Sequence, residues 1–189
     1  MQKDYAVTQK VIHWLMGIFI ILYLFIAQKF GNFRGDSVGF IAYYNEMRFA
    51  SRIDHATMGY ILTLLFVIRI FFRSRHGAAA LPADMPPWQV RAAHWGHVGL
   101  YVLMAVLLLS GIITASAASQ PIVIFGFYDA AFGAANEGLF ETVRQIHEIS
   151  TNLIIALIVI HIVAALYHHF IVRDNTTSRM LRFWKRTAR

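Results

Sequence analysis

The chain of 189 residues contains no cysteine. Disulfide bonds, thiolate-ligated metals and iron–sulfur clusters are therefore excluded, because each needs a cysteine sulfur. Charged residues are also scarce, at 14%, whereas hydrophobic residues make up 58% of the chain. A soluble domain of this length cannot bury so much apolar surface, so the composition predicts a membrane protein.

Four apolar runs are each long enough to cross a bilayer once, and none contains an aspartate or a glutamate. They cover residues 11–27, 56–72, 98–118 and 149–172. With their flanks they predict helices over about 8–28, 54–73, 92–118 and 146–172. The fold class we expect is an all-α membrane protein, with one transmembrane domain over 1–189 formed by a four-helix bundle. The first run is longer than a signal-peptide core and no small-residue cleavage site follows it, so we expect a retained helix.

The distribution of lysine and arginine predicts the orientation. Twelve of the seventeen lie in the N-terminal arm, the second connection with its flanks, and the C-terminal tail. The positive-inside rule then places both termini in the cytoplasm. The net charge of +7 is explained by attraction to anionic membrane lipids, and nothing else in the sequence suggests nucleic-acid binding.

The three connections differ in composition. The first, 31–52, is aromatic-rich, and we expect it to lie on the outer membrane surface. The second contains Pro82, Pro86 and Pro87 and is expected to be a stiff linker on the cytoplasmic side. The third, 119–145, is expected to be a second outer connection.

Four histidines pair by their expected depth. His147 and His161 are fourteen residues apart on one predicted helix, which places them about 21 Å apart along the axis and within roughly 40° of the same face. His13 lies at the depth of His161, near the cytoplasmic side, and His55 lies at the depth of His147, near the outer side. Two neutral imidazoles from separate helices complete a six-coordinate electron-transfer haem site. The pattern predicts an inner haem iron held by His13 and His161 and an outer one held by His55 and His147.

Small residues one turn beyond three of these histidines favour the same reading. Gly17, Gly59 and Ala165 each follow a histidine by four residues, on the face where a porphyrin would come close, whereas Thr151 breaks the pattern. A single interfacial histidine is more often an anchor, and a helical glycine more often serves helix packing. Four histidines that pair by depth favour haem ligation over those alternatives.

Several segments together resemble the bacterial cytochrome b-561 family. They are KVIHW at 10–14, DHATMG at 54–59 with Arg69 and Arg73 beyond it, AHWGH at 93–97, His147-Glu148, His161, and HHFIVRDNT at 168–176. The resemblance covers about residues 5–182. It implies a bundle with two haem b groups ligated by the same four histidines, ubiquinone as redox partner, and a location in the bacterial cytoplasmic (inner) membrane. One branch of the family oxidises superoxide at the outer face, while segment 110–129 looks closer to a branch with an unsettled substrate.

Other polar residues are candidates for contacts near the inner haem. Arg69 lies fourteen residues after His55, and we expect Arg69 and Arg73 to contact a haem propionate or a quinone, with snorkelling to the interface as the alternative. His168 lies two turns beyond His161, and we predict that it contacts the quinone, whose reduction takes up protons. The alternative is a histidine at the membrane interface without such a contact. His94 and His97 could flank the same region or a haem propionate, and anchoring of a helix entry is the reading that the sequence favours. Carboxylates favour first helical turns, so Asp54 and Glu148 are assigned no chemistry.

The function that the sequence predicts is electron transfer between an outer-face donor, superoxide or a protein, and the quinone pool. As an enzyme it would be an oxidoreductase of the superoxide:ubiquinone type. Cations of the first outer connection would attract superoxide; they are Lys29, Arg34, Arg48 and Arg52. The main alternative is a non-catalytic haem subunit that relays electrons for a partner protein. A zinc or cation transporter is less favoured, because an ion path usually needs carboxylates within the spans.

Overall fold

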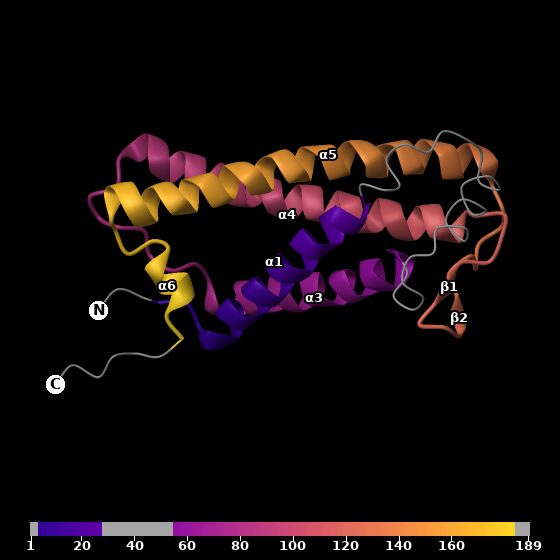
Figure 1. Cartoon of the computed structure of the whole chain (residues 1–189), viewed down its shortest axis with the longest axis horizontal. Helices are drawn as coiled ribbons and strands as arrows, with labels where there is room; N and C mark the ends of the chain where they lie inside the picture. Colours follow the sequence, from indigo (N-terminus) through magenta and orange to yellow (C-terminus); the bar gives the residue numbers. More distant parts are fainter. Residues whose placement is uncertain (1–3, 28–54, 184–189) are drawn as a thin grey trace.

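The structure is a computed structural model that describes residues 4–27 and 55–183. Within these residues lie four long helices, α1 (Val7–Ala27), α3 (His55–His76), α4 (Pro87–Ser116) and α5 (Glu137–Tyr167). Each belongs to a segment long and apolar enough to cross a membrane, so the predicted class of four-helix membrane bundle is confirmed. Helix α4 packs along α5, α1 packs along α3, and α3 also contacts α4 (Figure 1).

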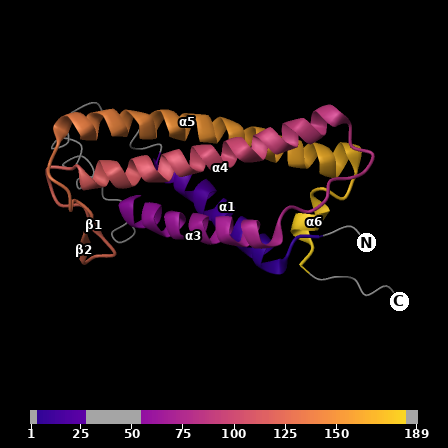
Figure 2. The same cartoon turned by 180° about the vertical axis from the view of Figure 1, so that it is seen from behind.

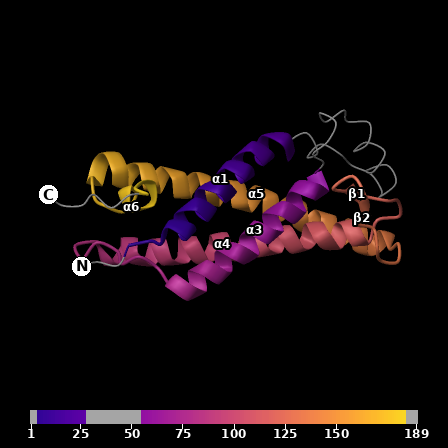
Figure 3. The ribbon, with the colours of Figure 1, turned by 90° about the horizontal axis from the view of Figure 1, so that it is seen from below.

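The two ends of the bundle differ. At one end lie the start of α1, the connection between α3 and α4, and the short helix α6 (Ser178–Leu181), so the described part of the chain both begins and ends here (Figure 1). We call this the terminal end. At the opposite end, the hairpin end, lies a small antiparallel hairpin of β1 (Val123–Ile124) and β2 (Tyr128–Asp129) (Figure 2). The view from below shows α1 and α3 crossing the long α4–α5 pair at an angle (Figure 3).

Three predicted helix boundaries need correction. Helix α4 begins at Pro87, not near 92, because proline at the first helical position presets the backbone and lacks only an N–H that would have no partner there. Helix α5 begins at Glu137, not near 146, because the Asn136 side chain accepts a 3.0 Å hydrogen bond from the Leu139 N–H and caps the helix. Helix α3 continues to His76 and ends where Gly77 adopts a left-handed φ of 72°.

The third connection is shorter than predicted. It contains the β1–β2 hairpin, whereas the sequence predicted a protein with helices alone. Its turn passes through Phe125 and Gly126, both with positive φ. The Phe125 N–H donates a 3.0 Å hydrogen bond to the Thr57 hydroxyl on α3. This bond fixes the hairpin to the helix that begins at His55. The first connection, including the predicted surface segment 31–52 and Asp54, lies outside the described residues.

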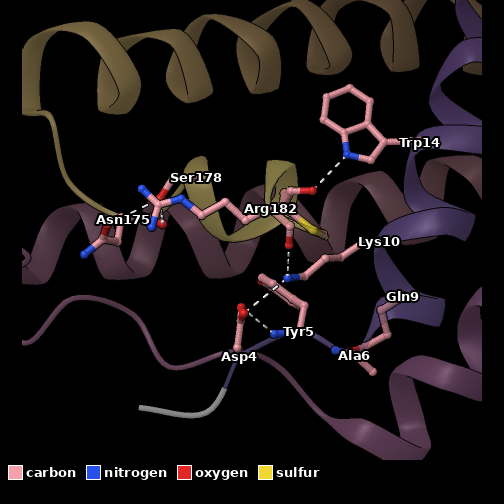
Figure 4. A network of polar contacts seen from close by, with 10 residues as sticks. Asp4, Tyr5, Ala6, Gln9, Lys10, Trp14, Asn175, Ser178 and Arg182 are labelled. Atoms are coloured by element: carbon pink, nitrogen blue, oxygen red, sulfur yellow. Dashed lines mark hydrogen bonds and ion pairs between the residues drawn. The ribbon is translucent and has the colours of Figure 1, made fainter. Parts of the chain in front are cut away.

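At the terminal end, polar contacts join segments that are far apart in the sequence (Figure 4). Lys10 is 3% exposed, and its Nζ contacts the Asp4 carboxylate at 3.2 Å and donates to the Arg182 carbonyl at 2.7 Å. The Trp14 indole N–H donates to the Met180 carbonyl at 3.0 Å. The Arg179 guanidinium also donates to the Ala80 carbonyl in the α3–α4 connection. The described parts of the three basic segments therefore meet at one end of the bundle.

The apolar core lies between the two ends. It contains side chains from all four long helices; they are Ile12, Met16, Leu62, Phe66, Met104, Leu108 and Ile154. Ile154 lies midway between His147 and His161 along α5. Large apolar side chains such as Leu22, Leu64 and Ile160 are about 60% exposed on the outside of the bundle, where lipid would cover them. The apolar core therefore separates the level of His147 from the level of His161 on α5.

Candidate functional site

At the hairpin end, two histidines from different helices face each other. His55 begins α3 and His147 lies in α5, and their ring centres are 5.9 Å apart with planes inclined at 75°. The ring of Tyr23 on α1 lies 4.9 Å from that of His55. Three helices thus enclose this pair.

At the terminal end, a second pair joins α1 to α5. The ring centres of His13 and His161 are 6.2 Å apart, with planes inclined at 69°. A third imidazole, His97 of α4, lies 5.6 Å from His161. From the sequence, His97 was expected to anchor a helix entry or, less favoured, to flank this haem region, and the structure puts its ring beside this pair. The AHWGH motif contained the residue, but only the packing of α4 on α5 reveals its neighbour.

The spacing within each pair fits a metal ion held between two imidazoles. With a nitrogen–metal bond of about 2 Å and a ring radius of about 1.1 Å, two ligands on opposite sides have ring centres about 6 Å apart. The separations of 5.9 and 6.2 Å match this value. A Cβ added at Gly17 or at Gly59 would meet no heavy atom within 4 Å, so neither position is filled by packed side chains. The donor set and the space both suit haem, whose iron takes histidine as an axial ligand.

The His147 ring is oriented by helix α4. Its Nδ1 lies 2.9 Å from the Leu107 carbonyl oxygen and 3.1 Å from the Ser110 hydroxyl. A carbonyl can only accept, so Nδ1 carries the proton, and Nε2 has its lone pair available for a metal.

Positive charge lies near the terminal-end pair. The Arg69 guanidinium lies 5.7 Å from the centre of the Tyr101 ring. It is also close enough to His13 and His161 for its positive charge to interact electrostatically with both imidazoles. Arg73 acts electrostatically on His97 and donates a 3.4 Å hydrogen bond to the Gly77 carbonyl. Both arginines therefore lie where an anionic or carbonyl group near this pair would be attracted.

His168 lies at the junction of α5 with a π-helical turn, η1 (His168–Val172). Its Nδ1 is 2.6 Å from Oδ2 of Asp174, and both side chains are largely buried, at 13% and 15% exposure. Partial burial raises the pKa of Asp174, but hydrogen bonds from the Thr176 N–H and from His168 outweigh burial and hold that pKa below its usual value. Asp174 is therefore a carboxylate that orients His168.

Other charged residues have simpler roles. Arg144 of α5 forms ion pairs with Glu141 at 2.9 Å and with Glu148 at 3.5 Å, which gives Glu148 a structural partner. In the described part of the chain, no three histidine or acidic side chains converge in a way that could hold a bare metal ion. This finding gives no support to a cation-transport site among those residues.

A membrane bundle with an imidazole pair at each end has the architecture of a membrane cytochrome. The comparison with known proteins agrees: the family described as "Prokaryotic cytochrome b561" matches residues 4–183. The chain therefore belongs to the prokaryotic cytochrome b561 family. It is a membrane b-type cytochrome, a haem-binding protein of electron transport.

Three relatives match the chain over nearly its whole length. "Cytochrome b561 homolog 1" of Escherichia coli (strain K12) is 27% identical over 177 residues, which cover 94% of this chain and 96% of the relative. "Probable superoxide oxidase CybB" of Yersinia pestis is 29% identical over 181 residues, covering 96% and 97%. "Cytochrome b561 homolog 2" of Escherichia coli (strain K12) is 29% identical over 184 residues, covering 95% and 92%.

Proposed function

We propose that this chain carries two haem b groups and transfers electrons between a donor at the hairpin end and the quinone pool near the terminal end. His55 and His147 would hold the first haem, and His13 and His161 the second. The observation that carries this proposal is the pair of imidazole separations, 5.9 and 6.2 Å, at two levels of one bundle. Bound haem supplies reversible one-electron redox chemistry.

The proposed location is the bacterial cytoplasmic membrane, with the terminal end and both termini in the cytoplasm. The positive-inside rule supports this orientation, because Lys10, Arg179 and Arg182 meet at the terminal end. The hairpin end would then face the outside. His147 and His161, about 21 Å apart along α5, would lie near opposite sides of a hydrocarbon core about 30 Å thick.

The terminal end offers groups suited to a quinone, whose full reduction consumes two electrons and two protons. His168 would donate a proton from Nε2 to a quinone oxygen, while the Asp174 carboxylate holds Nδ1. Arg69 would attract the oxygen as negative charge develops on it. Arg69 and Arg73 are equally suited to pair with haem propionates near His13 and His161.

Superoxide is the donor that we propose at the hairpin end. The relative named as a probable superoxide oxidase supports this choice. Each superoxide anion would lose one electron and leave as dioxygen. Arg144 is already paired with Glu141 and Glu148, so electrostatic attraction of the anion would depend on the cations of the first connection. Those cations lie outside the described residues.

The decisive experiment counts haem per chain in the purified protein and in single variants, using the reduced-minus-oxidised spectrum. We expect two haems in the wild type. His55→Ala and His147→Ala should remove one and the same haem, and His13→Ala and His161→Ala should remove the other. His94→Ala is the matched control, because the His94 ring contacts the neighbouring Trp95, and it should retain both haems.

Which haem each histidine variant loses tests the proposed pairs of ligands. If His55→Ala and His161→Ala removed the same haem, the proposed pairs would be wrong. A purified wild-type protein with one haem, or with none, would contradict the di-haem proposal. Electron delivery is tested separately, by mixing the reduced protein rapidly with a soluble quinone.

A further inference from the structure

Ser110 of α4 lies against the proposed outer haem ligand His147. Its hydroxyl donates a 2.9 Å hydrogen bond to the Leu107 carbonyl, and its oxygen lies 3.1 Å from Nδ1 of His147. The same Nδ1 is 2.9 Å from the Leu107 carbonyl oxygen. Three polar atoms therefore form a closed triangle between two membrane helices.

The protons in this triangle can be assigned. The Leu107 carbonyl has no hydrogen to donate, so it accepts from the Ser110 hydroxyl and from the His147 N–H. The Ser110 proton is used in that bond, so its oxygen faces His147 as an acceptor. The Nδ1–H of His147 is thus shared between two acceptors on α4, and Nε2 carries the free lone pair.

The surroundings restrict the His147 ring to this orientation. Ser110 is 4% exposed, so water does not compete for its hydrogen bonds. A Cβ at Gly111 would lie 3.1 Å from Cε1 and 3.3 Å from Nδ1 of His147, closer than an ordinary contact. The ring therefore packs directly on the α4 backbone, and the Ser110 hydroxyl is the polar side-chain group that it meets there.

We propose that Ser110 is a positioning residue for His147 and tunes the haem that this histidine would hold. The inference rests on the proposed function, because it assumes that His147 ligates iron through Nε2. Acceptors on Nδ1–H make an imidazole a stronger electron donor to the metal, which favours ferric iron. Removing the Ser110 oxygen should therefore raise the midpoint potential of the hairpin-end haem and loosen the orientation of the ring.

The Ser110→Ala variant tests the effect of the hydroxyl on His147 separately from the packing of α4 against α5. Small residues let membrane helices approach closely, and alanine keeps that property while it removes the hydroxyl. Ser116→Ala is the matched control, because the Ser116 hydroxyl makes the same kind of bond on the same helix, to the Ile113 carbonyl at 2.9 Å. Ser110→Thr retains a hydroxyl, so its hairpin-end haem should have the wild-type midpoint potential.

The test is a redox titration of the purified holoprotein followed through the visible spectrum, together with electron paramagnetic resonance of the ferric form. The resonance positions depend on the angle between the two imidazole planes, which is 75° here. We expect Ser110→Ala to raise the midpoint of the haem that His147→Ala removes, to move its resonance, and to leave the other haem unchanged. Haem loss from that site should be about tenfold faster, as is common when a partner of a metal ligand is removed.

Three results would overturn the proposal. One is a Ser110→Ala protein with the wild-type midpoint and resonance at this haem. Another is an equal shift in Ser116→Ala. The third is loss of both haems together in Ser110→Ala, which would show that the residue serves the fold. If instead His147→Ala removed no haem, the proposed function would be the part that failed.

Discussion

The Nδ1 atom of His168 lies 2.6 Å from Oδ2 of Asp174, six residues further along the chain. The two are brought together because α5 ends in a π-helical turn and Arg173 adopts a left-handed φ of 57°. The backbone then reverses, and the Thr177 hydroxyl donates a 2.7 Å hydrogen bond back to the Ala165 carbonyl. Asp174 thereby becomes the orienting partner of a histidine that could serve as a proton donor.

We expect His168→Ala to keep both haems but to slow their reoxidation by a soluble quinone. The loss should be at least about tenfold, since general acid–base catalysis contributes about 10²–10⁴-fold. Asp174→Asn should show a smaller loss. His169→Ala is the control, because its ring contacts Phe170 instead. If wild-type rates persisted in both His168→Ala and Arg69→Ala, the quinone would bind elsewhere.

The lowered pKa of Asp174 predicts a pH-dependent contribution to stability. A carboxyl whose pKa is lower in the folded protein stabilises the fold at pH values above its unfolded pKa, about 3.9. That contribution is lost as the pH falls from this value through the folded pKa. Thermal unfolding should therefore show wild type more stable than Asp174→Asn near neutral pH, with a difference that shrinks below about pH 3.9. A difference independent of pH would argue against a stabilising role for the ionised Asp174 carboxylate.

Arg69 should raise the potential of the terminal-end haem, because a positive charge favours the reduced, less positive iron. A charge at roughly 10 Å in an effective dielectric of about 20 contributes about 1.7 kcal/mol, or about 70 mV for one electron. We expect Arg69→Gln to lower that midpoint by tens of millivolts and to leave the hairpin-end haem unchanged. Arg75→Gln is the control, since Arg75 lies on the exposed Phe71 ring. Equal shifts of the terminal-end midpoint in Arg69→Gln and Arg75→Gln would show that Arg69 has no specific effect on this haem.

His97 should affect the terminal-end haem and His94 should not. The His97 ring lies 5.6 Å from His161, whereas the His94 ring contacts its neighbour Trp95. We expect His97→Ala to retain both haems and to shift the spectrum or the midpoint of the one that His161→Ala removes. His94→Ala should match the wild type in both measurements. Loss of the hairpin-end haem in His97→Ala would contradict the observed geometry.

Superoxide should reduce the haem rapidly in stopped-flow mixing, and added salt should slow the reaction. The cations of the first connection would attract the anion, and salt screens that attraction. Arg144→Gln should slow the reaction further, because it removes a positive charge beside the Glu141 and Glu148 carboxylates, which repel the anion. Haem reduction no faster than the spontaneous dismutation of superoxide would exclude it as the donor.

Much of the fold could be predicted from the sequence, because length and apolarity alone decide which segments can cross a bilayer. The equal depth of His13 and His161, and of His55 and His147, followed from the helical rise and the alternating direction of the helices. The ends of the helices were harder to predict. Asn136 as a cap and Pro87 as a first residue are weak local signals, and both fall within the connections that the apolar runs predict.

Only the tertiary structure decided which side chains meet across helices. Depth along a helix follows from residue number, but the rotation of one helix against another depends on how all their side chains pack. For this reason the neighbours of His147 on α4, Leu107 and Ser110, had no signal in the sequence. The same holds for Asp174, which reaches His168 only because the chain turns back at Arg173. For His97 the sequence allowed a position near the inner haem, but only the packing of α4 on α5 puts its ring beside His161.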